Sequence, residues 1–273
     1  MRVDFFATLW GNEHLRVEEF LENAVREGFT GVEMTFPLGQ SAERDRRAAL
    51  VAEAGLELIA IHGEVADADF EEHKRHFEDW LRHLAAANPV FITSQSGRDM
   101  FSFEENMEIL DICNGVSRGT GIPIVQETHR SKLTFAAHLT ARYLQARPEM
   151  RLTLDVSHWF NVHERYLEDL QEPLNLAISR TDHIHARVGF IEGPQVPDWR
   201  GEEWREVLDK HLAVWDGVVR LARSDGRRRV TVTPEYGPEP YALRHPVSGE
   251  LLADPWEMNV AMKRMLEQRW QSW

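Results

Sequence analysis

Short apolar runs alternate with longer amphipathic segments along the whole chain of 273 residues. Apolar side chains that recur at every second position indicate strands, and those that recur at every third or fourth position indicate helices. Strands are expected at 3–10, 30–36, 56–62, 89–93, 122–127, the first half of 151–162, 182–188 and 229–235. Helices are expected at 16–27, 42–54, 70–87, 103–117, 134–147, 165–178, 202–224 and 255–268. An unbroken series of strand–helix units predicts a (β/α)8 barrel that forms a single domain over residues 1–273.

A doubly wound open sheet is the main alternative architecture. Such a sheet binds its ligand at one switch point, and its nucleotide-binding members carry Gly-x-Gly-x-x-Gly after a strand. That glycine motif follows none of the expected strands, and polar residues collect at several strand ends instead. The pattern therefore favours the (β/α)8 TIM barrel, whose active site lies at the C-terminal ends of its strands.

The charge balance of the chain is acidic, with a formal net charge of -14. An acidic surface repels nucleic acids and anionic membranes, so we expect a small-molecule ligand and neither of those partners. The single cysteine, Cys113, cannot form an internal disulfide, and the sequence contains neither a signal-peptide pattern nor a membrane-length apolar run. These features predict a cytoplasmic protein and leave open whether it forms a homo-oligomer.

The stretch 151–162 combines a strand with two groups that can carry chemistry. Thr153 and Asp155 lie on one face of the expected strand, and His158 follows three residues later, where the chain turns away. Both groups can bind one divalent cation, or one can bind it while the other contacts the ligand. The alternative is that Asp155 caps the next helix and His158 lies on the surface.

Three more strand ends carry residues of the same kind. They are Glu127 on the fifth strand, His185 on the seventh and Glu235 on the eighth, each on the more polar face of its strand. In a barrel this face points into the lumen. Together with Asp155 they would repel one another or stay unsatisfied without a cation. The oxygen and nitrogen donors suit one divalent ion, Mn²⁺, Mg²⁺, Co²⁺ or Zn²⁺.

The chain resembles the xylose isomerase-like TIM barrel superfamily, in particular its sugar (phosphate) isomerase and epimerase branch. The resemblance covers the whole chain and rests on the motifs Gly31-Val-Glu-Met, Ile61-His62, Val125-Gln-Glu127-Thr-His129, Leu154-Asp155-Val-Ser-His158 and His183-Ile-His185. It implies that Glu127, Asp155, His185 and Glu235 bind the metal and that His158 contacts the substrate. The Glu-Thr-His sequence on the fifth strand departs from the Glu-Asn-His of many relatives.

Two carboxylates around a metal suit proton transfer next to a carbonyl group. One of Glu127 and Glu235 would remove the α-proton and the other would return it, while the metal stabilises the enediolate. We therefore expect a metal-dependent isomerase or epimerase of a keto sugar or a related hydroxy-carbonyl compound, with a role in carbohydrate metabolism.

Four further residues are candidates for the substrate pocket. Trp10 and His62 end the first and third strands, and Trp159 follows His158; each of these three rings either shapes a sugar pocket or packs in the core. Arg187 is assigned to substrate binding because it lies close to His185, although the 3-epimerases carry their substrate-binding arginine further along the chain.

Several polar residues near the strand ends keep two roles open. Glu33 and His183 either orient the metal ligands or are satisfied polar groups of the core, and the role of His129 is open in the same way. The segment 193–200 is either a lid over the mouth or a long connection.

Three other functions are compatible with parts of this pattern. A dehydratase of a cyclic polyol or keto acid would use the same proton abstraction, followed by loss of hydroxide. An endonuclease that cleaves DNA at abasic sites shares the barrel, but such enzymes use more histidines, and the acidic charge disfavours DNA. A non-catalytic sugar-binding barrel would not need the pair Glu127 and Glu235.

Overall fold

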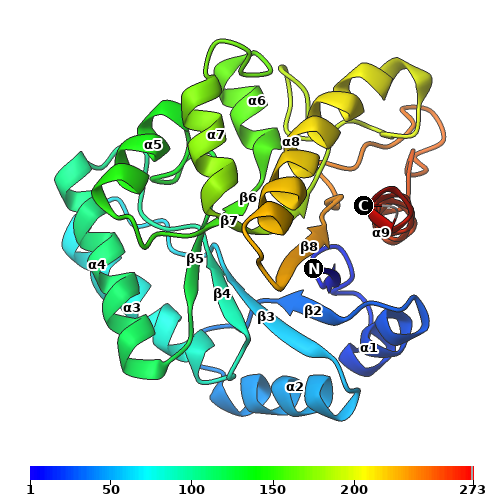
Figure 1. Ribbon diagram of the computed structural model, residues 1–273. Coiled ribbons are helices and arrows are strands. Elements are labelled where there is room, and N and C mark those ends of the chain that lie inside the picture. The colour runs from blue at the N-terminus through cyan, green and yellow to red at the C-terminus, as the bar shows by residue number, and fades with distance from the viewer. Residues whose placement is uncertain (272) are drawn as a thin grey trace.

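Eight parallel strands form a closed barrel in the computed structural model, which describes residues 1–271 and 273. The strands are β1 Arg2–Thr8, β2 Gly31–Met34, β3 Glu57–His62, β4 Phe91–Ser94, β5 Ile124–Glu127, β6 Leu152–Leu154, β7 Thr181–Ala186 and β8 Arg229–Pro234. They pair in chain order, and β8 pairs with β1 (Figure 1). The predicted (β/α)8 TIM barrel is confirmed, and the doubly wound sheet is excluded because an open sheet would leave two unpaired edges.

The helices surround this barrel as an outer ring (Figure 1). They are α1 Val17–Arg26, α2 Ser41–Glu53, α3 Phe70–Ala85, α4 Phe103–Thr120, α5 Ala137–Ala146, α6 Val156–His163, α7 Gln171–Arg180, α8 Arg205–Ser224 and α9 Pro255–Gln271. Within residues 1–271 and 273, none of them is both long and apolar enough to cross a membrane.

The region after β6 differs from the prediction of one helix at 165–178. The chain forms α6 directly after the strand, with Asp155 as its N-cap, and ends it at Glu164, which has a positive φ of 50°. A second helix, α7, then begins at Gln171. The sequence pattern missed α6 because it follows the strand without a turn, and its apolar residues look like a continuation of that strand.

Local signals fix the ends of several helices. Ser102 and Glu105 form a reciprocal capping box at the start of α4. Gly121 ends the same helix with a φ of 76°, a left-handed conformation that glycine adopts without steric cost. These two signals fix the start and the end of α4, so only a short connection separates this helix from β5.

The lumen of the barrel is filled below its mouth. The hydroxyls of Thr93 on β4 and Thr153 on β6 lie 3.0 Å apart, and these strands are not neighbours, so the contact crosses the lumen. The ring of His183 packs edge-on against Phe6 of β1, with ring centroids 6.5 Å apart. Because side chains occupy the interior, ligands have access only to the mouth.

Candidate active site

Four side chains that end consecutive strands meet at the C-terminal mouth of the barrel. Glu127 ends β5, Asp155 follows β6, His185 lies in β7 and Glu235 follows β8. Each offers a ligand atom, these atoms all lie within 4.8 Å of one another, and all four side chains are buried. The structure thus brings together the residues that the sequence singled out as metal ligands.

The ring of His185 is held by a carboxylate from the opposite side of the barrel. Its Nε2 lies 3.1 and 3.2 Å from the two carboxylate oxygens of Glu33, so Nε2–H donates to that group. Its Nδ1 faces Glu127 Oε1 at 3.5 Å and Glu235 Oε2 at 3.3 Å and has no hydrogen-bond partner among the described residues. Metal-binding histidines show this arrangement, with one nitrogen bound to a carboxylate and the other directed at the ion.

Asp155 uses its two carboxylate oxygens for different partners. Oδ1 accepts hydrogen bonds from the Ser157 amide at 2.9 Å and from the Ser157 hydroxyl at 2.5 Å, which caps helix α6. Oδ2 accepts from Arg187 Nη2 at 2.6 Å. The capping role and the position at the mouth, which the sequence posed as alternatives, therefore coexist in one side chain.

Arg187 is a buried cation at the edge of this acidic group. It shares the lumen face with His185, and its Nη2 lies 3.8 Å from Glu235 Oε2 as well as 2.6 Å from Asp155 Oδ2. Burial alone would lower the pKa of Arg187, but the charges of Asp155 and Glu235 raise it. Arg187 also lines the cavity, so its guanidinium is placed to contact a ligand.

His158 is fully buried, in contrast to the surface position that was the alternative for it. Its Nδ1 lies 3.1 Å from Arg130 Nη1, its Nε2 lies 2.5 Å from Arg187 Nη2, and its ring centroid is 4.0 Å from that of His129. Burial, followed by the charges of His129 and Arg187, lowers the pKa of His158 well below its usual value. His129 and Arg187 line the cavity while His158 does not.

The protonation of the acidic group reflects its burial. Burial raises the pKa of both Glu127 and Asp155. Burial also acts to raise the pKa of Glu235, but the charges of His185 and Arg187 outweigh it, so this pKa is lowered. Burial would lower the pKa of His185, yet the surrounding glutamates raise it well above its usual value. In the absence of a cation, the site therefore retains protons that a bound cation would displace.

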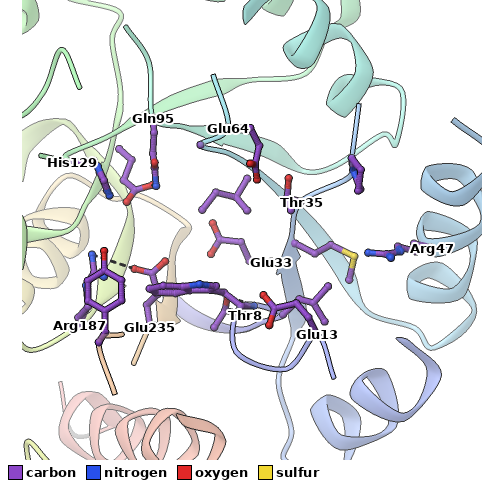
Figure 2. Close-up of a pocket in the computed structure, with 18 of the residues that line it drawn as sticks. Thr8, Glu13, Glu33, Thr35, Arg47, Glu64, Gln95, His129, Arg187 and Glu235 are labelled. Carbon is purple, nitrogen blue, oxygen red and sulfur yellow. Dashed lines mark hydrogen bonds and ion pairs between the residues drawn. The ribbon is translucent and has the colours of Figure 1, made fainter. Parts of the chain in front are cut away.

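A cavity of about 470 Å³ opens onto Glu127 and Glu235 of this group. Figure 2 shows Arg187, Glu235, His129 and Gln95 on one side of it, with Glu33 near its centre. Trp10 also lines this cavity, as the sequence suggested, and its ring packs edge-on against Tyr241 with centroids 5.4 Å apart.

Two rings suggested for the pocket, those of His62 and Trp159, lie outside it. His62 ends β3 on the face opposite Ile61, and its ring packs against Phe77 of α3 with centroids 5.1 Å apart. Trp159 is fully buried in α6, where its Nε1 donates to the Thr134 carbonyl at 2.8 Å. The alternative of core packing describes both, because strand alternation turns His62 toward the helices and α6 points Trp159 away from the mouth.

Two further residues that line the cavity, Gln95 and Tyr241, were not predicted from the sequence. Gln95 donates to Glu127 Oε2 at 3.1 Å, and it follows Thr93 by two positions, so strand parity could have identified it. Tyr241 lies in the loop after β8, where no periodic pattern indicates the direction of a side chain.

The loop 193–200 packs against the segment that follows β8. The side chain of Gln195 accepts from the Gly237 amide at 2.7 Å and donates to the Gly237 carbonyl at 3.1 Å. The hydroxyl of Tyr236 donates to the Pro197 carbonyl at 2.6 Å. These bonds connect the two loops beside the mouth.

The donor set fits a divalent cation. Three carboxylates and one imidazole converge, and Nδ1 of His185 is directed at two of the carboxylates without a partner in the described chain. Oxygen donors with a single imidazole suit Mn²⁺, Mg²⁺, Co²⁺ or Zn²⁺. Cys113 is buried and hydrogen-bonded to Ser96, and it is not among the converging groups.

No family model matches the chain, and no curated protein matches it. Solved structures do match it over nearly its full length. The probable 3-DHS dehydratase AsbF from Bacillus anthracis, involved in petrobactin synthesis, is 16% identical, with a TM-score of 0.62 and coverage of 97% of this chain and 99% of that chain. A D-allulose 3-epimerase from Methylomonas sp., in complex with D-allulose, is 14% identical, with a TM-score of 0.64 and 98% coverage of both chains.

A third match is a xylose isomerase-like TIM barrel protein from Mycobacterium smegmatis in complex with magnesium. It is 11% identical, with a TM-score of 0.62 and coverage of 97% of each chain. At such identities the likeness concerns the fold. The chain therefore has the fold of the xylose isomerase-like TIM barrels.

Proposed function

We propose that the protein is a divalent-metal-dependent isomerase or epimerase of a keto sugar or a related small hydroxy-carbonyl compound. The observation that carries this proposal is the buried convergence of Glu127, Asp155, His185 and Glu235, with the unpartnered Nδ1 of His185 among the carboxylates. Glu127 and Glu235 also line the cavity. A carbohydrate ligand is supported by two solved structures of similar fold, a D-allulose 3-epimerase in complex with D-allulose and a D-psicose 3-epimerase in the presence of D-fructose.

The four converging residues would hold the cation, and Glu33 would fix the ring of His185 behind it. When bound, a divalent cation supplies a Lewis acid that polarises a carbonyl group and makes the neighbouring C–H bond more acidic. Asp155 Oδ2 accepts from Arg187 Nη2 at 2.6 Å, so a cation held by Asp155 would compete with Arg187 for this carboxylate. The guanidinium of Arg187 would then have donors available for oxygen atoms of the substrate.

Glu127 and Glu235 are the groups that would move the proton. They come from β5 and β8 and approach Nδ1 of His185 to 3.5 and 3.3 Å. One carboxylate would take the proton from the carbon next to the carbonyl, and the other would return a proton. Return to the neighbouring carbon gives isomerisation, and return to the opposite face of the same carbon gives epimerisation.

Arg187 and Trp10 would bind the substrate, because both line the cavity. His158 does not line it but contacts Arg187 through Nε2 at 2.5 Å. We therefore assign His158 to positioning the guanidinium of Arg187, in place of the direct substrate contact that the resemblance implied.

Dehydration is a second candidate, and the position of Tyr241 favours it. Its hydroxyl oxygen accepts from Arg130 Nη2 at 2.6 Å, so the phenol keeps its own proton to donate, and Tyr241 lines the cavity. Abstraction of an α-proton by Glu127 or Glu235, followed by protonation of a leaving β-hydroxyl by Tyr241, would release water. The fold is also similar to that of a probable dehydratase.

The test is incubation of the protein with Mn²⁺ and a panel of ketoses in D₂O, followed by NMR of the products. Deuterium at the carbon next to the carbonyl in an isomerised or epimerised product is expected. An unsaturated product would indicate the dehydratase, and no metal-dependent exchange with any compound would overturn both candidates. Glu127→Gln should slow the exchange by about 10²–10⁴-fold, while Glu64→Gln, a change at an exposed residue of the cavity wall, is the matched control.

A further inference from the structure

The cavity extends beyond the acidic group to residues of β2, β3 and the start of α1. Its volume of about 470 Å³ is roughly three times the ~150 Å³ cavity that accommodates a benzene ring. In Figure 2, Glu235, Arg187 and His129 lie on one side of Glu33, and Thr35, Glu13 and Arg47 lie on the other. We call the part on the side of Thr35 the second compartment.

Beside the charged Glu13 and Arg47, the walls of the second compartment carry five apolar side chains. They are formed by the start of α1 with the loop before it, by the end of β2 with the loop after it, and by the end of β3. The apolar residues of these segments that line the cavity are Leu15, Val17, Met34, Pro37 and Ile61. Ile61 shares the parity of the lumen, yet it remains partly exposed at the mouth. Apolar walls that face water favour the binding of an apolar group.

One buried hydroxyl, in addition to the charged Glu13 and Arg47, interrupts these apolar walls. Thr35 Oγ1 is buried and has no hydrogen-bond partner in the part of the chain that the structure describes. Because a buried hydroxyl is normally hydrogen-bonded, Thr35 is available to a polar atom of a ligand. Arg47 also lines the cavity, but its Nε is 2.6 Å from Glu43 Oε1, so its charge is already paired.

We infer that the substrate has two parts: a hydroxy-carbonyl part at the acidic group and an apolar, ring-sized substituent in the second compartment. The chemical class is a conjugate of a keto sugar that keeps its carbonyl free and carries the substituent through an oxygen on another carbon, with one polar atom in the substituent for Thr35. The placement of the polar part rests on the proposed function. The preference for an apolar substituent rests on the walls alone, so the two can be tested separately.

Isothermal titration calorimetry with two non-reacting probes tests this preference. Methyl β-D-glucopyranoside and phenyl β-D-glucopyranoside carry the same sugar and differ only in the substituent, and both lack the carbonyl needed for turnover. For the full-length protein with excess Mn²⁺, the phenyl compound should bind about 10-fold more tightly, or better, since its ring is removed from water.

Leu15→Trp should fill the second compartment and reduce the ratio of the phenyl to the methyl compound's affinity to about 2-fold or less. The affinity of the methyl compound should change little. Leu38→Trp is the matched control, because Leu38 is 40% exposed and lies outside the cavity. Thr35→Val is a milder variant that does not depend on the fold tolerating a larger ring. It should weaken the binding of 4-hydroxyphenyl β-D-glucopyranoside several-fold and leave the binding of the phenyl compound unchanged.

Equal affinities of the two probes for the wild-type protein would overturn the inference. An equal fall of the phenyl-to-methyl affinity ratio in Leu15→Trp and Leu38→Trp would also overturn it. The same holds if neither probe binds the wild-type protein up to its solubility limit. If the wild-type protein prefers the phenyl compound about 10-fold but shows no metal-dependent exchange in D₂O, the proposed function is overturned. The preference of the second compartment for an apolar substituent would still hold.

Discussion

The two halves of the barrel mouth differ in chemistry. Strands β5 to β8 present the acidic group and its histidine, whereas the lumen faces at the ends of β1 to β4 carry neutral groups, with Glu33 as the exception. The β5–β8 half carries Glu127, Asp155, His185 and Glu235, and the β1–β4 half carries Thr8, Glu33, Ile61 and Gln95. The comparison indicates that reaction chemistry is concentrated on one half and that recognition of the rest of the substrate falls to the other.

Glu33 is the point at which the two halves depend on each other. It lies on β2 but binds His185 on β7 across the lumen, at 3.1 Å. Burial would raise the pKa of Glu33, yet the charges of His185 and His183 hold it below its usual range. The β1–β4 half therefore contributes the carboxylate that orients His185, a proposed metal ligand of the β5–β8 half.

The largest expected effect comes from removing a proposed metal ligand of the β5–β8 half. His185→Ala deletes the only imidazole of the four converging groups, so bound Mn²⁺ should fall from one equivalent to a small fraction. Inductively coupled plasma mass spectrometry of the dialysed protein measures this, with circular dichroism to verify the fold. Glu64→Gln, a change at an exposed residue that follows β3, is the control and should retain the ion. Unchanged metal content in His185→Ala would contradict the proposed site.

The next effect separates binding of the cation from transfer of the proton. Glu127→Gln keeps an oxygen ligand but removes the base, so turnover should fall by about 10²–10⁴-fold, while metal content changes less. Rates of solvent deuterium incorporation with a substrate found by the ketose panel provide the measurement. A near-normal rate in both Glu127→Gln and Glu235→Gln would contradict the roles of these residues.

A smaller effect should follow from breaking the link between the halves. Glu33→Gln retains an acceptor for His185 Nε2–H but removes the charge, so metal affinity should fall by about 10–100-fold. Titration of apo-protein with Mn²⁺ measures the change. Glu13→Gln, on an exposed wall of the same cavity, is the matched control. If both variants bound Mn²⁺ like the wild type, Glu33 would be a core residue without a role in the metal site.

The smallest effect on activity is expected at His62, which ends β3 but faces the helices. Burial lowers the pKa of His62 to about 3, so the folded protein keeps the ring neutral while the unfolded chain protonates it near pH 6.5. Folding free energy present above pH 6.5 is therefore lost as the pH falls toward 3, by up to about 1.4 kcal/mol per pH unit.

His62→Phe should flatten this part of the acid stability curve and leave turnover within about 2-fold, as is usual for a residue remote from the substrate. Urea unfolding at a series of pH values measures the slope. A large loss of turnover with unchanged stability would return His62 to the substrate pocket, where the sequence analysis allowed it.

Strand alternation made much of this site predictable. Asp155, His185 and Glu235 could be assigned to the lumen because each follows a strand with one polar and one apolar face. The same rule, applied to His62, would have placed it with Leu58 and Ala60 on the outer face. Alternation is local, however, and it cannot show which residues meet across the lumen.

The remaining features depend on contacts between distant segments. The bond between Glu33 and His185 joins residues 152 positions apart, and that between Arg130 and Tyr241 joins residues 111 positions apart. Tyr241 lies in a loop, and His158 lies in a helix that begins without a turn. Neither position carries a periodic pattern, so the neighbours of these side chains follow only from the closed barrel.

The divided carboxylate of Asp155 makes the start of α6 a reporter of events at the mouth. Its Oδ1 accepts from the Ser157 amide at 2.9 Å, while its Oδ2 accepts from Arg187 Nη2 at 2.6 Å. Any cation that immobilises Asp155 should also suppress opening of the first turn of α6. Amide hydrogen exchange at Ser157 should therefore slow when Mn²⁺ is added, whereas exchange at Glu105, in the capping box of α4, should not change. Occupancy of the mouth could in this way be followed without knowledge of the substrate.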